Sequence, residues 1–213
     1  MTDWMNLLIG FAMGLNLLAL ASSRLPSIIR TAAVQGIVIG ILPLLIEPEL
    51  RALLLLVAIA TVVIKGFVIP ALLFRALRAA NIDREVQPLL GFTISLLLGA
   101  GASIGAVVLG RLLPMRPEDA EVLLVPGALA TVVCGFLLLI GRAKAITQVC
   151  GYLMLENGIY LFGLLLLGSV PLLVEAGILL DVTVAIFVIG VVMDHIQREF
   201  DSLDTRKLTV LRE

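Results

Sequence analysis

Long apolar runs, separated by proline, glycine or charged residues, fill most of this 213-residue chain. The hydrocarbon core of a lipid bilayer is about 30 Å thick, so a helix of about 20 mainly apolar residues crosses it. The runs therefore predict an all-α integral membrane protein with about seven transmembrane helices. The expected spans are Trp4–Ala21, Ser27–Ile46, Ala52–Phe74, Pro88–Leu112, Val122–Ile140, Ile146–Leu167 and Leu172–Met193.

The composition excludes the other broad classes of protein. Hydrophobic residues make up 61% of the chain and charged residues 15%, whereas soluble domains are roughly half apolar and about a quarter charged. A soluble fold could not cover this much apolar surface, and a disordered chain would be polar and highly charged. The formal net charge of −1 gives no reason to expect a nucleic-acid partner.

The segments between the spans are too short to fold alone, so residues 1–213 are expected to form a single transmembrane helical domain. The first four helices occupy 1–121, three more occupy 122–194, and 195–213 form a cytoplasmic tail that lies on the membrane face, lies on a partner or is solvated. The first span ends like a signal peptide, at Ala19-Leu20-Ala21. Its leader carries Asp3 and no Lys or Arg, so we expect a retained helix.

The positive charges of the loops predict the orientation, because cytoplasmic loops carry an excess of Lys and Arg. Seven spans would put the two termini on opposite sides. One set of loops contains only Arg51, Arg111 and Arg116. The other set contains Arg24, Arg30, Arg75, Arg78, Arg84, Arg142, Lys144, Arg198, Arg206, Lys207 and Arg212. The C-terminus is therefore expected in the cytoplasm and the N-terminus outside.

Few residues of the chain could hold a cofactor. Cys134 and Cys150 lie in different apolar runs without a CxxC pair, and His195 is the single histidine. Haem b needs two axial ligands, an iron–sulfur cluster about four thiolates and structural zinc four ligands. We therefore expect no catalytic residue, cofactor-binding residue or metal ligand in this chain.

Four charged residues fall within the expected spans: Lys65, Glu156, Glu175 and Asp181. Each needs a reason, because a Lys or Asp at the centre of a membrane helix costs on the order of 3 kcal/mol. At about 1.5 Å of helical rise per residue, Lys65, Glu156 and Asp181 lie about 14 to 20 Å into their helices and share roughly one depth. They are expected to form a row within the membrane plane. Glu175 lies near the outer edge, where it either takes part in transport or reaches water.

Polar side chains accompany Glu156 along the sixth span and predict a polar seam that orients water. The seam consists of Gln148, Tyr152, Asn157 and Tyr160. A spacing of four residues keeps most of these side chains on one slowly drifting face of a helix. In the third span, Pro70 disfavours the helix four residues back, at Gly66, which predicts a bend and a loosened turn beside Lys65.

These groups suit proton transfer. Burial in a medium of low dielectric constant favours the neutral form of acids and amines, so both can change protonation near neutral pH. We expect Glu156 and Asp181 to carry protons and Lys65 to modulate or relay them. The alternative is that Lys65 and a carboxylate form a buried pair that fixes helix packing, without ion traffic.

Three stretches resemble the E component of hydrogenase-4-type complexes: Gln148–Gly158 (QVCGYLMLENG), Val174–Asp181 (VEAGILLD) and Leu203–Glu213 (LDTRKLTVLRE). That family is in turn similar to the K subunit of bacterial complex I and the C subunit of multisubunit cation/proton antiporters, which would correspond to residues 122–194. Those relatives carry a membrane glutamate in a Gly-x-Glu-x-Met-x-Asn-like stretch. This chain departs from the pattern, with Leu153 at that place and the acid one turn later, at Glu156.

The resemblance implies a non-catalytic membrane subunit of a complex-I-like hydrogenase or formate hydrogenlyase in a bacterial or archaeal cytoplasmic (inner) membrane. The expected partners are antiporter-like subunits, a complex-I-like membrane anchor and a peripheral redox arm that carries the nickel–iron centre and iron–sulfur clusters. The chain would then contribute to translocation of protons or sodium. Three alternatives stay open: a structural adaptor without ion transfer, a subunit of a multisubunit cation/proton antiporter, and a free-standing small transporter.

Overall fold

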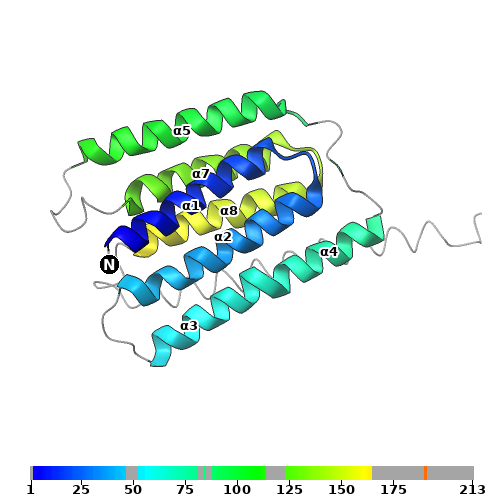
Figure 1. The fold of residues 1–213 in the computed structure, drawn as a ribbon. Coiled ribbons are helices and arrows are strands. Elements are labelled where there is room, and N and C mark those ends of the chain that lie inside the picture. Colours follow the sequence, from blue (N-terminus) through cyan, green and yellow to red (C-terminus); the bar gives the residue numbers. More distant parts are fainter. Residues whose placement is uncertain are drawn as a thin grey trace, which may run out of the picture.

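The computed structural model describes residues 2–46, 52–80, 84, 88–113, 123–164 and 190, and within these ranges it is helical, without a β-strand (Figure 1). The elements are α1 (Thr2–Ala21), α2 (Leu25–Ile46), α3 (Ala52–Val63), the π-helix η1 (Ile64–Val68), α4 (Ile69–Ala80), α5 (Phe92–Leu112), α7 (Leu124–Gly141) and α8 (Ala145–Leu164). The helices lie side by side as a bundle, as expected for segments whose backbone must bond internally in lipid.

Four of the helices form a closed ring of contacts. α1 packs on α2 and α7, and α8 packs on α2 and α7, so the interior of the bundle lies among these four. α5 packs outside the ring against α1 and α7, whereas α3, η1 and α4 pack on the other side, mainly against α2 (Figure 1). The ring therefore brings α1 and α2, from the beginning of the chain, against α7 and α8, which are distant in sequence.

Five of the described segments are long and apolar enough to cross a membrane, and they match the first five expected spans. They are Asp3–Ala21, Leu25–Ile46, Leu54–Arg78, Phe92–Leu112 and Leu124–Gly141. α8 has a comparable length of 20 residues but carries Gln148, Glu156 and Asn157, which make it more polar. Apart from Gly190, the expected seventh span lies outside the described residues, as do the cytoplasmic tail, Glu175 and Asp181.

The fourth expected span begins later than predicted. Pro88, Leu89 and Leu90 are not helical, and α5 starts at Phe92 after Gly91. The backbone N–H of Leu90 bonds to the carbonyl oxygen of Gly141 at the end of α7, at 3.1 Å. The apolar character of Leu90 predicts that it belongs to the helix. Its hydrogen bond to the end of α7 instead holds it in a non-helical segment before α5.

The distortion predicted in the third span is present as the π-helical turn η1. The N–H of Ile69 bonds to the carbonyl oxygen of Ile64, five residues back, and Pro70 follows directly. A π-turn widens the helix by one residue and is frequent at functional sites. Here it carries Lys65.

α7 and α8 approach so closely that glycine is needed at their contact. A Cβ atom added to Gly151 would lie 2.5 Å from the backbone nitrogen of Leu139, and one added to Gly135 would collide with the backbone of Leu155. Small residues allow such backbone contact between membrane helices, where van der Waals packing drives association. α8 is thereby fixed against α7, which determines where its polar residues point.

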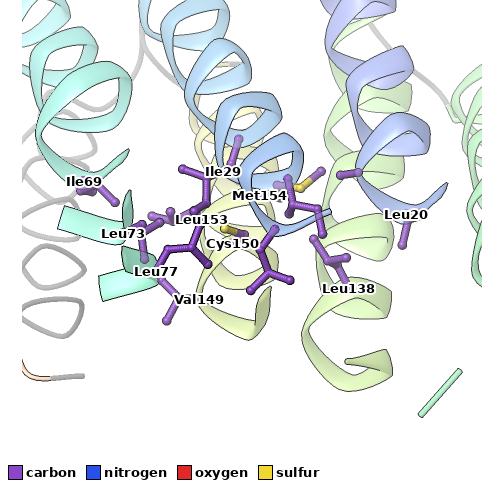
Figure 2. Packing of buried hydrophobic residues seen from close by; sticks show 14 of the residues in the cluster. Leu20, Ile29, Ile69, Leu73, Leu77, Leu138, Val149, Cys150, Leu153 and Met154 are labelled. Carbon is purple, nitrogen blue, oxygen red and sulfur yellow. The ribbon is translucent and has the colours of Figure 1, made fainter. Parts of the chain in front are cut away.

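Two apolar clusters fill the interior at different heights. The first apolar cluster, part of which Figure 2 shows, consists of Ala19, Leu20, Leu25, Ile28, Ile29, Ala32, Ile69, Leu73, Ala76, Leu77, Cys134, Leu138, Val149, Cys150, Leu153 and Met154. The second apolar cluster consists of Met5, Ile9, Ala12, Ile39, Leu42, Leu124, Ala128, Leu161 and Leu164. Between the two, each helix of the ring has a stretch that belongs to neither cluster.

Candidate functional site

Lys65 and Glu156 form a buried salt bridge inside the bundle. The Lys65 Nζ atom lies 2.9 Å from Glu156 Oε1, and the two side chains are only 4% and 2% exposed. Lys65 Nζ also donates a hydrogen bond to Asn157 Oδ1 at 3.1 Å and lies 5.5 Å from the centre of the Tyr160 ring. One helix, α8, therefore supplies a carboxylate, an amide oxygen and an aromatic face to a single ammonium group.

The polar contacts continue from Asn157 across the bundle. Asn157 Nδ2 donates to Gln35 Oε1 at 3.3 Å, and Gln35 Nε2 donates to Asn16 Oδ1 at 2.7 Å. Gln35 Nε2 also lies 3.2 Å from the carbonyl oxygen of Ala12. Asn16 Nδ2 ends the series by donating to Thr131 Oγ1 at 2.9 Å. We call Thr131, Asn16, Gln35, Asn157, Lys65 and Glu156 the polar layer.

The polar layer lies between the two apolar clusters and joins five elements: α1, α2, η1, α7 and α8. Along α2, for example, Ala32 belongs to the first cluster and Ile39 to the second, with Gln35 between them. Along α8 the order is Met154, Glu156 and Leu161. All members of the layer are buried. Apolar packing above and below keeps the layer in a medium of low dielectric constant, which strengthens its hydrogen bonds.

Four residues that the sequence pattern singled out lie together in this region. Glu156, Asn157 and Tyr160 each contact the Lys65 ammonium. The remaining charges of the row, Asp181 and Glu175, lie outside the described residues, so their place in it stays a prediction.

Two members of the predicted seam lie elsewhere. Gln148 is eight residues before Glu156, about 12 Å along the helix, and its Nε2 donates to the carbonyl oxygen of Arg142 at 2.9 Å. Tyr152 packs against the first apolar cluster. The seam divides because a spacing of four residues drifts around a helix with 3.6 residues per turn.

Asn16, Gln35 and Thr131 are members of the polar layer that the sequence patterns did not single out. Each lies within an expected span, is uncharged, and has no charged residue beside it in the sequence. Moving a side-chain amide from water into hydrocarbon also costs several kcal/mol when the amide makes no hydrogen bond there. Two amides in the middle of the first two spans were therefore a usable signal.

A second buried cation, Arg142, closes one end of the bundle. Its guanidinium donates to the carbonyl oxygens of Leu20 and of Leu90, and it lies 4.3 Å from the centre of the Phe92 ring. Sequence analysis treated Arg142 as a loop charge, but the residue is 1% exposed. Its burial follows from the contact of the segment before α5 with the end of α7.

The comparison with known proteins finds a relative along almost the whole chain. The chain is 36% identical over 215 residues to Uncharacterized protein Rv0085 of Mycobacterium tuberculosis, and the match covers 98% of this chain and 97% of the relative. The chain belongs to the Rv0085 family. It is also 34% identical over 85 residues to Hydrogenase-4 component E of Escherichia coli K12 and of Shigella flexneri, which covers 40% of this chain and 39% of each relative. No family model and no solved structure matches the chain.

For this member of the Rv0085 family, the chemistry that the geometry permits is transfer and storage of charge. The ammonium of Lys65 lies 2.9 Å from the Glu156 carboxyl group, so a change of charge on either group would act directly on the other. Within the described ranges, no group of three or more His, Cys, Asp or Glu side chains is placed to hold a metal ion. The polar layer thus places one acid and one amine in direct contact inside the bundle.

Proposed function

We propose that the chain is a membrane-arm subunit of a complex-I-like hydrogenase complex, in which the Lys65–Glu156 pair takes part in proton translocation. The observation that carries this proposal is the salt bridge of 2.9 Å, buried between two apolar clusters. Ionisable side chains inside membrane segments are costly and usually mark ion or proton pathways. The partial likeness to Hydrogenase-4 component E supports the hydrogenase part of the proposal.

In such a complex the redox chemistry belongs to partner subunits, which would carry the nickel–iron centre and the iron–sulfur clusters. This chain would contact antiporter-like subunits and a membrane anchor subunit through its lipid-facing helices. Its part in the coupling is electrostatic: a change of charge in a neighbouring subunit shifts the proton affinity of Glu156, and Lys65 transmits the shift. The translocated ion in this proposal is a proton, because the site offers an acid and a base.

The decisive experiment is a Glu156→Gln substitution in the assembled complex. Glutamine keeps the shape of glutamate but cannot carry a proton or a negative charge. We expect redox turnover to continue while the number of ions pumped per turnover falls severalfold. A Thr31→Val variant serves as the matched control, since Thr31 is buried on α2 and its hydroxyl bonds to the carbonyl oxygen of Ser27 in the same helix. Unchanged pumping in Glu156→Gln would remove Glu156 from the role.

A structural adaptor is the second candidate, and one observation favours it. The Lys65 ammonium is enclosed by Glu156, Asn157 and Tyr160, all on α8, as expected of a pair that locks two helices together. In that case Glu156→Gln would reduce the amount of complex recovered from the membrane. Pumping per turnover by the complex that does assemble would be normal. The two candidates are thus separated by measuring assembly and pumping on the same preparation.

A further inference from the structure

The direction of the hydrogen bonds in the polar layer is determined independently from both ends. Lys65 can only donate, so the Asn157 atom that faces it must be the amide oxygen. The other Asn157 atom is then the NH2 group, and the Gln35 atom that faces it must be the oxygen. Starting from Lys65, each side-chain amide therefore turns its oxygen toward the lysine.

The end of the polar layer at Ala12 requires the same orientation of the Gln35 amide. The carbonyl oxygen of Ala12 can only accept, so the Gln35 atom 3.2 Å from it must be Nε2. The Nε2 group also donates to Asn16 Oδ1, which leaves Asn16 Nδ2 to donate to Thr131 Oγ1. Two anchors that share no atom thus require one orientation of Gln35.

This orientation has an electrostatic consequence. The negative ends of the Asn157 and Gln35 amide dipoles point toward the Lys65 ammonium, and their positive ends point away. Hydrogen bonds to a charged group are about twice as strong as neutral ones, and linked bonds polarise one another in a medium of low dielectric constant. The chain of amides therefore favours the charged form of Lys65 over the neutral form.

The amides also end any proton path in this direction. An amide NH2 group donates hydrogen bonds but is not an acid near neutral pH, and an amide oxygen is not a base there. A proton on Lys65 therefore has no acceptor along Asn157, Gln35 and Asn16. The carboxylate of Glu156 is the acceptor beside Lys65.

Charged and titratable groups of the described helices surround this region unevenly. Glu156 and Tyr160, both on α8, face Lys65. The packed neighbours α2 and α4 carry Arg30, Arg75 and Arg78, which are exposed, and α3 carries no titratable residue. Among the described charged side chains of these elements, the carboxyl group of Glu156 is therefore the one in contact with the Lys65 ammonium.

We propose that Asn157 and Gln35 act as positioning residues that keep Lys65 permanently charged, so that Lys65 is a fixed positive charge beside the carboxyl group of Glu156. This inference rests on the proposed function and deepens it, because it changes Lys65 from a relay into a fixed positive charge. The orientation of Gln35 is the feature that holds the charge. A side chain at position 35 that offers an oxygen to Asn157 keeps Lys65 charged, and one that offers none does not.

The test measures the charge of Lys65 in the full chain in lipid nanodiscs. The chain has three lysines, Lys65, Lys144 and Lys207, so selective ¹⁵N labelling of lysine gives few Nζ signals to assign by nuclear magnetic resonance. We expect the Lys65 signal of the wild type to be that of an ammonium at neutral pH. A neutral amine there would overturn the proposal.

Variants at position 35 separate orientation from simple packing. Gln35→Leu removes the oxygen that accepts a hydrogen bond from Asn157 Nδ2, so the Asn157 amide can rotate. We expect the ratio of charged to neutral Lys65, measured in the variant and the wild type at the same alkaline pH, to fall roughly tenfold. In Gln35→Glu an oxygen still faces Asn157, and the ratio should equal or exceed that of the wild type. Thr31→Val on the same helix is the control and should leave the ratio unchanged. If Gln35→Leu does not fold, Gln35→Met, which fills more of the glutamine volume, is measured in its place.

Three results would contradict the proposal. The first is an unchanged ratio of charged to neutral Lys65 in folded Gln35→Leu or Gln35→Met. The others are an equal fall of this ratio in Gln35→Leu and Gln35→Glu, or a comparable fall in Thr31→Val. The charge measurement does not depend on pumping. A charged Lys65 together with normal pumping by Glu156→Gln would refute the proposed function alone. A neutral wild-type Lys65 together with lost pumping would refute only the present inference.

Discussion

Gly36 on α2 lies directly against the Cβ atom of Lys65, and a Cβ added to Gly36 would be 2.7 Å from it. The contact places the stem of Lys65 beside the backbone of α2, one residue after Gln35. Because the ammonium reaches α8 from this position, the packing of η1 on α2 determines whether Lys65 and Glu156 can meet. A glycine that carries no chemistry therefore belongs to the geometry of the site.

Gly36→Ala is expected to push η1 away from α2 and to lengthen the distance from Lys65 to Glu156. Overpacking of this kind costs about 1 to 3 kcal/mol in the free energy of unfolding, which unfolding in mixed micelles, followed by circular dichroism, would measure. Gly101→Ala on α5 is the matched control, since no described atom lies within 4 Å of a Cβ added there. A loss of stability in the control equal to that in Gly36→Ala would show that the contact with Lys65 is not the cause.

Breaking the ion pair from one side should cost more than removing both partners. Lys65→Met removes the cation 2.9 Å from the buried Glu156 carboxyl group, and Glu156→Leu removes the acid beside the buried Lys65 ammonium. Each should therefore lower the free energy of unfolding by about 3 kcal/mol or more. The double variant Lys65→Met/Glu156→Leu should recover most of that loss. Equilibrium unfolding of all four proteins gives the coupling free energy. Additive losses in the double variant would mean that the two side chains do not stabilise each other.

Arg142→Lys should destabilise the end of the bundle although the charge is kept. Arginine reaches the carbonyl oxygens of both Leu20 and Leu90 and stacks on Phe92, whereas an ammonium cannot reproduce this planar set of contacts. We expect a loss of about 2 kcal/mol and faster hydrogen exchange at the N–H of Leu90. Arg78→Lys, at an exposed arginine that bonds only its own helix in the described contacts, is the control. Equal stability of Arg142→Lys and the wild type would indicate that the guanidinium contacts contribute little.

The sequence was sufficient for the first five expected spans, which the described helices match, and for noticing that Lys65 and Glu156 interrupt apolar runs. Each follows from local composition: an apolar run of about 20 residues crosses the bilayer, and a charge in its middle is costly wherever the helix packs. The distortion next to Lys65 was also predictable, because Pro70 acts through the covalent structure of its own helix.

The partners of Asn16, Gln35 and Thr131 could not be predicted from the sequence. Nothing within their own spans says which residue each of them bonds, since their partners lie 19 to 122 positions away in the chain. Arg142 shows the same limit from the other side. Its neighbours in sequence are those of a loop, and only the docking of Leu20 and Leu90 buries it.

Local chemistry alone therefore determined that this chain forms long apolar helices and that an acid and an amine interrupt two of its apolar runs. The reason is that the cost of placing a group in hydrocarbon depends on the group itself. Only the tertiary structure decided that Lys65 meets Glu156 and Asn157, and that two amides orient the site from behind. Those contacts depend on how each helix is rotated against the next, and the rotation is set by close packing, such as that of Gly151 on α7, between segments that are remote in sequence.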